Sequence, residues 1–203
     1  MSITGIILAG GHSSRMGENK AFLKVGGKMV IERIADQLAT ISSQMIVVAN
    51  NHEEYRFLGL PLVSDHWKER GPLAGIHAGL MASKMQKNLI VACDMPFISA
   101  EIGKILLKKL DTHQAAVPEI DGRLHPLFAA YRKDTKEAAE QALRDNRLRI
   151  RGFLHDINAS IMKGEELKRM GFLYEQAHFF NMNRPDEYQM ALKMAAEKGK
   201  DSK

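Results

Sequence analysis

The feature that most constrains this chain is an apolar strand that runs directly into a glycine-rich, basic segment. Residues 3–8 read Ile-Thr-Gly-Ile-Ile-Leu, a run that predicts a buried parallel strand. The adjacent Gly10 and Gly11 lack Cβ atoms, so the backbone there can turn sharply and come close to a ligand. Successive N–H groups in such a turn form an anion cradle, to which Arg15 and Lys20 add positive charge. The sequence therefore predicts a phosphate-binding loop.

Two common phosphate-binding motifs do not match this segment. A Walker A loop ends in Gly-Lys-Ser/Thr, whereas Gly17 is followed here by Glu-Asn-Lys. The dinucleotide motif Gly-x-Gly-x-x-Gly does not match either, because the first two glycines of this segment are neighbours. The alternative that stays open is a tight strand-to-helix turn with a solvated basic rim.

The composition predicts one globular domain. The 203 residues are 45% hydrophobic and 26% charged, and we expect residues 1–196 to form a single domain followed by a frayed tail at 197–203. No run of about 18 apolar residues predicts a membrane span, and no secretory signal pattern opens the sequence. The single cysteine, Cys93, cannot form an internal disulfide, which fits a reducing compartment. We therefore predict a cytoplasmic protein.

The charge balance favours small anionic ligands. Lysine and arginine number 29 against 24 acidic residues, which gives a formal net charge of +5. These charges are scattered, and no basic block with interleaved aromatics predicts nucleic-acid binding.

Strands and helices alternate through the first two-thirds of the chain. Strands are predicted at residues 3–8, 45–49, 60–64, 88–93, 114–118, 124–131 and 159–162. Helices are predicted at residues 28–41, 52–58, 72–80, 99–110, 134–143, 165–170 and from 185 onward. Asp134 and Glu137 fit a capping box at the start of the fifth helix. This order predicts a Rossmann-like, three-layer α/β fold with a mostly parallel twisted sheet and helices on both faces.

Polar residues follow several of these strands at the point where each strand ends. In open parallel sheets, ligands sit beyond the carboxyl ends of the strands. Residues remote in sequence should therefore converge on one edge of the sheet, namely Gly10, Asn50, Asp65 and Asp94.

Asp94 is the strongest single candidate for chemistry. It follows an uncharged strand, and a carboxylate there can hold Mg²⁺ between the protein and a triphosphate. A helix or turn cap is the alternative. Asp65 can accept a hydrogen bond from a nucleotide base, or it can be a plain turn residue. Cys93 is predicted to be a small buried apolar residue rather than a nucleophile.

The roles of three further polar residues remain open. His125, placed by the prediction in a strand, can bind an anionic acceptor or be a satisfied half-buried side chain, and the second reading is slightly favoured. Asn181 and Asn183 alternate in an extended piece, so both amides point to one side; they can orient phosphate or cap the following helix. The remaining histidines lack zinc-ligand spacing, and no serine nucleophile elbow is visible.

The first loop reads Leu-Ala-Gly-Gly-x-Ser-x-Arg-Met-Gly-x-x-Lys. This resembles the N-terminal motif of nucleotidyltransferases, which pass a nucleoside monophosphate from an NTP to a phosphorylated acceptor. The Leu-Ala-Gly-Gly form in so short a chain most resembles the molybdenum cofactor guanylyltransferases, whereas cytidylyltransferase relatives usually carry Leu-Ala-Ala-Gly. Matching segments follow in order at residues 71–75, 93–96, 125–126 and 181–187.

The resemblance implies a nucleotide-diphospho-sugar transferase-like fold and a set of site residues. It implies that Lys20 lies at the nucleotide phosphates, that Asp65 contacts guanine and that Asp94 binds Mg²⁺. The residues it sets against the nucleotide are Leu8, Ala9, Gly10 and Gly11, and those near the pterin are Asn181 and Asn183. Asn19 departs from the pattern, because many relatives have aspartate before the lysine.

The implied reaction is transfer of GMP from GTP to the terminal phosphate of molybdopterin, with Mg²⁺ as cofactor and pyrophosphate as the second product. Arg15 and Lys20 would steady the charge on the departing pyrophosphate. Transient contact with molybdenum-insertion or molybdoenzyme-maturation proteins is also expected. The alternatives are a related enzyme that uses CTP or a sugar-phosphate acceptor, a non-catalytic nucleotide-binding module, and a structural interaction domain.

Overall fold

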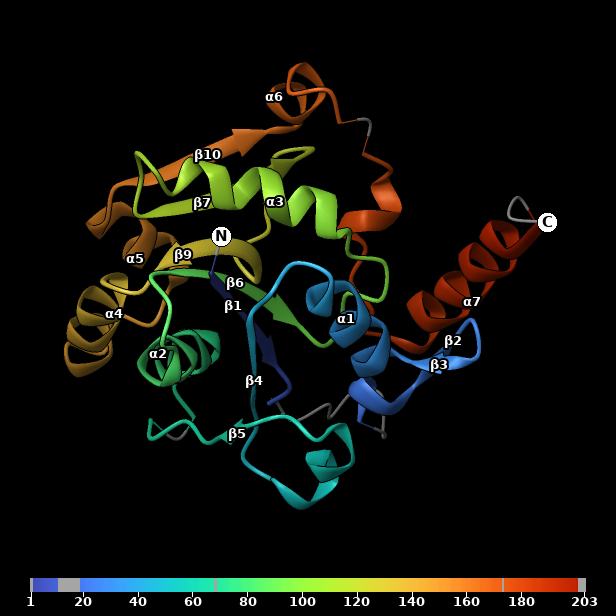
Figure 1. Cartoon of the computed structure of the whole chain (residues 1–203), viewed down its shortest axis with the longest axis horizontal. Helices are drawn as coiled ribbons and strands as arrows, with labels where there is room; N and C mark the ends of the chain where they lie inside the picture. The colour runs from blue at the N-terminus through green and yellow to red at the C-terminus, as the bar shows by residue number, and fades with distance from the viewer. Residues whose placement is uncertain (1, 11–18, 68, 173, 201–203) are drawn as a thin grey trace.

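The computed structural model describes residues 2–10, 19–67, 69–172 and 174–200. Two residues of the predicted site, Gly11 and Arg15, lie outside these ranges. Figure 1 shows a twisted central sheet with helices on both faces. No helix in the described ranges is long and apolar enough to cross a bilayer.

The main sheet carries both parallel and antiparallel strands. They are β1 (Ile3–Leu8), β4 (Gln44–Val48), β5 (Leu62–Val63), β6 (Lys87–Ala92), β7 (Ala115–Ile120), β8 (Arg123–Leu124), β9 (Phe128–Arg132) and β10 (Ala159–Lys163). Their order is β10-β7-β9-β6-β1-β4-β5, with β8 paired to β7. Strand β1 is parallel to β4 and β6, and the β4–β5 and β7–β10 pairs are parallel as well. The predicted α/β class with a mostly parallel sheet is confirmed.

The other elements surround this sheet. The helices are α1 (Val30–Ala39), α2 (Pro72–Ala82), α3 (Ala100–Lys109), α4 (Thr135–Arg144), α5 (Ile150–Asp156), α6 (Gly164–Arg169) and α7 (Pro185–Lys200). Three short 3₁₀ helices are η1 (Lys20–Phe22), η2 (Glu53–Leu58) and η3 (Gln176–Phe179), and a small hairpin joins β2 (Lys24–Val25) to β3 (Lys28–Met29).

A hydrophobic core lies on each face of the sheet, between the strands and the helices that cover that face. Alternate side chains of a strand point to opposite faces, so Ile3 and Ile7 of β1 join a core with α1 and α3. Ile6 and Leu8 join the other core, with α2, α4 and α5. Both faces of β1 are thus covered, which explains why its sequence is apolar at nearly every position.

The carboxyl ends of the parallel strands meet at one edge, as predicted. Leu8 is in register with Val48 of β4 and with Ala92 of β6. Beyond the strands, Ala9 N donates to Val48 O at 2.9 Å, and Cys93 N donates to Leu8 O at 3.0 Å. The residues that follow β1, β4 and β6 therefore start from adjacent points.

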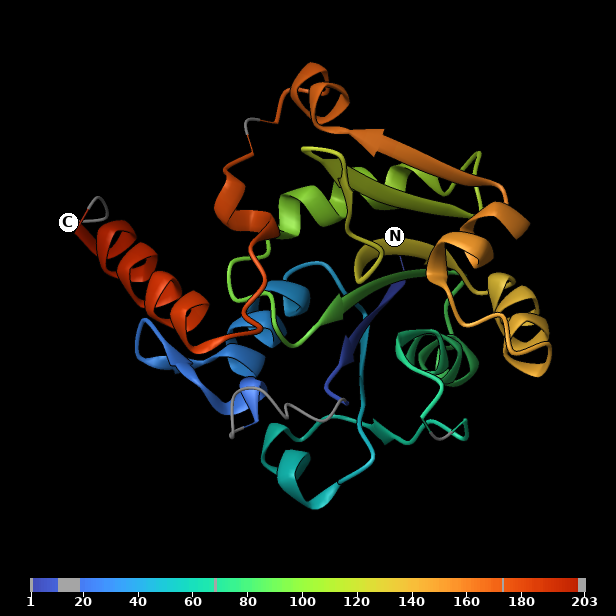
Figure 2. The same ribbon diagram turned by 180° about the vertical axis from the view of Figure 1, so that it is seen from behind.

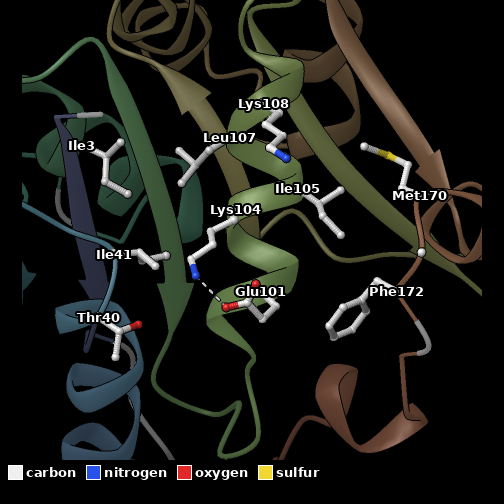
Figure 3. A pocket seen from close by; sticks show the side chains of 11 residues that line it. Ile3, Thr40, Ile41, Glu101, Lys104, Ile105, Leu107, Lys108, Met170 and Phe172 are labelled. Atoms are coloured by element: carbon white, nitrogen blue, oxygen red, sulfur yellow. Dashed lines mark hydrogen bonds and ion pairs between the residues drawn. The ribbon is translucent and has the colours of Figure 1, made fainter.

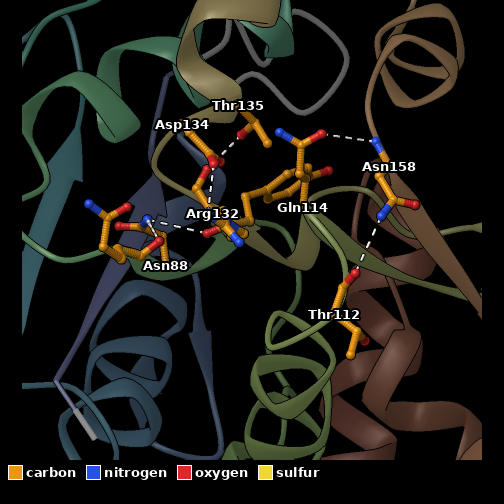
Figure 4. A network of polar contacts seen from close by, with 9 residues as sticks. Asn88, Thr112, Gln114, Arg132, Asp134, Thr135 and Asn158 are labelled. Atoms are coloured by element: carbon orange, nitrogen blue, oxygen red, sulfur yellow. Dashed lines mark hydrogen bonds and ion pairs between the residues drawn. The ribbon is translucent and has the colours of Figure 1, made fainter.

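A polar network lies at the other edge of the sheet, where β6, β7 and β10 begin. It connects β6, β7 and β9 to the segment before β10 (Figure 4). The fully buried Asn88 donates from Nδ2 to Tyr131 O at 3.2 Å. Asn158 donates from its backbone N–H to Gln114 Oε1 at 3.1 Å, and from Nδ2 to Thr112 O at 3.3 Å. The bond from Asn88 satisfies a buried amide group, and the two bonds from Asn158 tie the segment before β10 to the start of β7.

The structure corrects the predicted strand at 124–131. It is two strands, β8 and β9, and His125 lies in the turn between them rather than in a strand. His125 N donates to Pro118 O at 2.9 Å, and Phe128 N donates to His125 O at 3.1 Å. Strand β9 then runs antiparallel to both β6 and β7, so it separates two strands that point the same way.

Further differences concern the helices, among them α5, which the sequence did not predict. The residue pair 28–29 is strand β3, so the predicted helix at 28–41 begins only at Val30. The predicted capping box of Asp134 and Glu137 does not form, because Asp134 already has helical dihedrals (φ −64°, ψ −20°) and its carboxylate instead pairs with Arg132 at 2.9 Å. Helix α7 continues to Lys200, past residue 197 where the tail was expected to begin.

The close approach of α2 to β1 gives a test of the packing. We expect Gly79→Ala to lower the free energy of unfolding by about 1–3 kcal/mol, because the new Cβ would stand 2.5 Å from Ile6 Cγ2. Gly152→Ala in α5 is the matched control, because its Cβ meets nothing within 4 Å. The control should be neutral or stabilising by about 0.4–1 kcal/mol. Urea denaturation of the two variants measures both values, and equal midpoints would contradict the tight α2–β1 contact.

Candidate active site

Asp94 lies just beyond β6, beside the end of β1. Its carboxyl is half-buried, and burial is the main cause that raises its pKa above the ordinary value. The positive charges of Lys20 and Arg123 act in the opposite direction on this pKa, so both cations lie within electrostatic range of the carboxylate. Asp94 is therefore a poorly solvated carboxylate with cationic neighbours from two distant parts of the chain.

Lys20, the first residue of η1, lies within electrostatic range of this carboxylate. Its Nζ donates to Asn183 Oδ1 at 2.7 Å, a contact between residues 163 positions apart. Met182 N, one residue earlier, donates to Asp94 O at 2.8 Å. Figure 2 shows the segment between η3 and α7 passing the carboxyl end of β6. The structure therefore brings Lys20, Asp94 and Asn183 together, three residues that the sequence prediction assigned to one site.

The segment that carries the two asparagines is fixed at its far end by Glu187. Glu187 Oε2 accepts from Asn183 N at 2.5 Å and from Arg184 N at 3.0 Å, so it caps the start of α7. Met182 is fully buried between the half-buried Asn181 and Asn183. This alternation agrees with the prediction that the two amides share one side.

Asp65 lies beyond β5, on the other side of β1. Asn50 Nδ2 donates to Asp65 Oδ2 at 3.2 Å, and Asp65 N donates to Asn50 Oδ1 at 3.3 Å. Asp65 Oδ1 is buried and has no hydrogen-bond partner among the described residues. A buried carboxylate oxygen without a partner is costly in a protein alone, and a ligand N–H donor would satisfy it.

Leu8, Ala9 and Gly10 lie between the Asp94 and Asp65 sides of this edge. Leu8 and Ala9 are buried, whereas Gly10 is exposed, with no atom of the described residues within 4 Å of the position that a Cβ would take. A ligand can therefore approach the backbone at Gly10 without a side chain in the way.

Two candidates have environments that argue against chemistry. Burial, helped by Arg123, lowers the pKa of His125 to about 4, and its ring lies 5.0 Å from the Phe179 ring. His125 is therefore neutral near pH 7 and packed, which favours the structural reading. Burial raises the pKa of the Cys93 thiol to about 12, so no thiolate is available, as the sequence prediction held.

Sequence reasoning missed Arg123 and Tyr55 at this edge, and it named Glu187 only as part of the motif, without its capping role. Arg123 follows the turn at residues 121–122, and nothing in the hydrophobic pattern of the sequence predicts that its charge lies near Asp94. Glu187 had a usable signal, because a carboxylate three residues after the entry to a helix commonly caps it. Tyr55 of η2 donates to Ala9 O at 2.8 Å, and no periodicity marks a lone buried tyrosine in a short helix.

A separate cavity lies along α3. A cavity of about 500 Å³ is lined by Ile3 at the amino end of β1, by α3 side chains and by Met170 and Phe172 (Figure 3). None of the described residues of the predicted site lines it. In the described ranges, no three His, Cys, Asp or Glu residues are grouped to hold a metal by themselves. A metal at Asp94 would therefore take its remaining ligands from substrate phosphates and water.

The fold and this edge together define a nucleotidyltransferase: an open α/β sheet, an exposed glycine after β1, and a lysine, a carboxylate and an amide that converge beside it. The chain belongs to the family described as "MobA-like NTP transferase domain", whose model matches residues 5–159. The resemblance predicted from the motifs is confirmed.

Individual relatives agree with this assignment. A protein of Pelotomaculum thermopropionicum named "Probable molybdenum cofactor guanylyltransferase" is 36% identical over 195 residues, which cover 96% of this chain and 94% of the relative. The structure of molybdopterin-guanine dinucleotide biosynthesis protein A from Archaeoglobus fulgidus has a TM-score of 0.82 at 26% identity, and the match covers 96% of this chain and 99% of that one. A cytidylyltransferase structure from Thermus thermophilus, at 18% identity and a TM-score of 0.68 over 97% of this chain and 100% of that one, shares the fold.

Proposed function

We propose that this protein transfers GMP from GTP to the terminal phosphate of molybdopterin, which yields pyrophosphate and the guanine dinucleotide form of the cofactor. The family and the names of its relatives support this reaction. The observation that carries it is the convergence of Lys20, Asp94 and Asn183 beside the end of β1, because a triphosphate and an acceptor phosphate need cationic, metal-binding and amide groups at one point.

The reaction is a displacement at the α-phosphorus of GTP. An oxygen of the acceptor phosphate forms the new P–O bond, the bond to the bridging oxygen of the β-phosphate breaks, and pyrophosphate leaves with that electron pair. Lys20, and Arg15 with it, neutralises charge on the leaving group. No side chain forms a covalent intermediate, so the chain acts by position and by charge.

Asp94 suits a divalent cation, which the family suggests, and we propose Mg²⁺. Its carboxylate oxygens are hard donors in a poorly solvated corner. Mg²⁺ held there by Asp94 would offset the negative charge of the triphosphate. Asn181 and Asn183 would line the acceptor side, where Arg123 supplies a second positive charge near Asp94.

The direct test is pyrophosphate release from GTP with molybdopterin and Mg²⁺. We expect product only when all three are present, and no comparable release when CTP replaces GTP. Release with CTP and not GTP would make the protein a cytidylyltransferase. Nucleotide binding without any release would make it a binding module.

Asp65 provides a test of base selectivity. Guanine presents N–H donors to an acceptor, and Asp65 Oδ1 is a buried acceptor without a partner. We expect Asp65→Asn to weaken GTP binding by about tenfold or more, because an amide offers a donor where an acceptor is needed. Titration calorimetry with GTP measures this, and inhibition by inorganic tripolyphosphate should not change. Asp111→Asn, an exposed carboxylate paired with Lys87, is the control. Equal loss for GTP and tripolyphosphate would remove Asp65 from base recognition.

A further inference from the structure

The Tyr55 hydroxyl contacts both ends of the predicted phosphate-binding segment. It donates to Ala9 O at 2.8 Å and accepts from Asn19 Nδ2 at 2.8 Å. The Tyr55 side chain is only 2% exposed, and its ring packs against Phe22 of η1 with centroids 5.1 Å apart. One buried hydroxyl therefore joins the residue after β1 to the residue that opens η1.

The direction of these two bonds depends on the amide of Asn19. A phenol has one proton and so donates one hydrogen bond. Burial raises the pKa of Tyr55 to about 12, so this proton is retained near neutral pH. Because Asn19 Nδ2 donates, the Tyr55 proton stays directed at Ala9 O. A carboxylate at position 19 could only accept, and it would compete with Ala9 O for that proton.

Glu54 also favours an amide over a carboxylate at position 19. Asn19 Nδ2 also lies 3.0 Å from Glu54 Oε2, and Asn51 Nδ2 donates to Glu54 Oε1 at 2.7 Å. An aspartate at position 19 would place two carboxylates side by side, which is unfavourable. Asn19 and Glu54 are therefore a matched pair in this chain, and the departure from the motif has a physical partner.

We propose that Tyr55 is a positioning residue that, with Asn19 and Glu54, fixes the end of β1 at Ala9 against the start of η1, so that the Gly10 backbone and Lys20 are held in place for the triphosphate. The inference rests on the proposed function, since it assumes that GTP binds at this segment. Groups held in place before binding lose less freedom when the ligand arrives. Tyr55 itself touches no reacting atom.

The first test is Tyr55→Phe, which keeps the buried ring and removes only the hydroxyl. We expect the Kd and KM for GTP to rise about tenfold, with kcat and the KM for molybdopterin nearly unchanged. A purely structural role would lower the melting temperature and leave the KM for GTP alone. That outcome would overturn the inference.

The second test exchanges charges across the Asn19–Glu54 pair. Asn19→Asp should raise the KM for GTP about tenfold, and adding Glu54→Gln should restore part of it, because the two carboxylates no longer face each other. Glu53→Gln is the matched control: this exposed neighbour pairs with Arg56 and not with Asn19, so it should restore nothing. Equal rescue by both changes, or none by Glu54→Gln, would contradict the pairing.

Calorimetric titration of wild type and Tyr55→Phe with GTP distinguishes failure of the proposed function from failure of the positioning role. If wild type does not bind GTP, the proposed function fails. If wild type binds GTP and Tyr55→Phe binds it equally well, only the positioning role of Tyr55 fails.

Discussion

Asp94→Asn should reduce turnover about a thousandfold or more while the protein stays folded, which corresponds to about 4 kcal/mol of lost transition-state stabilisation. The amide has nearly the shape of the carboxylate, so the backbone contact from Met182 N to Asp94 O can persist. What is lost is the negative charge that would bind Mg²⁺. Initial rates of pyrophosphate release measured against Mg²⁺ concentration test this.

The Asp94→Asn substitution should lower turnover but raise the stability of the metal-free protein. Because burial raises the pKa of Asp94 in the folded state, the folded protein holds that proton more tightly than the unfolded chain does. The ionised carboxylate therefore costs stability above the raised pKa, and this cost disappears as the pH falls toward the ordinary value of 3.8. Without metal, we expect Asp94→Asn to melt at a higher temperature than wild type near pH 7, with a smaller difference at lower pH. Normal Mg²⁺-dependent turnover by this variant would remove Asp94 from the reaction.

Lys20→Ala should weaken GTP binding by about 10- to 100-fold, because a charge-assisted contact to phosphate is lost. Calorimetric titration with GTP measures the effect. Lys24→Ala is the matched control, because Lys24 is an exposed neighbour on β2. Unchanged GTP affinity in Lys20→Ala would separate this lysine from the triphosphate.

Lys20 also donates to Asn183, so its loss has a second consequence that can be measured apart. Asn183→Ala removes the same hydrogen bond and leaves the positive charge in place. We expect it to affect the KM for molybdopterin more than the Kd for GTP. If Lys20→Ala and Asn183→Ala gave the same profile, the amide contact rather than the charge would explain both.

The convergence of Asp94, Asp65 and the end of β1 was predictable because it follows from strand direction alone. Parallel strands end at one edge, and strongly apolar runs mark where they end. The placement of β9 between β6 and β7 was not predictable, because the hydrophobic pattern does not show which strands become neighbours. The sequence also placed His125 in one long strand, although it lies in a break between β8 and β9, which both run antiparallel to β7.

The side-chain contacts that complete the site were harder to foresee. Tyr55 and Asn19 are 36 residues apart, and their hydrogen bond depends on how η2 packs against η1. Arg123 depends on the length of the β7–β8 turn. Motif resemblance identified Lys20 and Asn183 as members of one site, but only the fold shows that they touch.

That contact has a consequence for synthesis of the protein. Every strand of the sheet precedes Asn183 in the chain, so the sheet can be paired before this amide is made. The ammonium of Lys20 meets its amide partner only after a further 163 residues have been translated. Under the proposed function, the site is therefore complete only once the segment before α7 has been made.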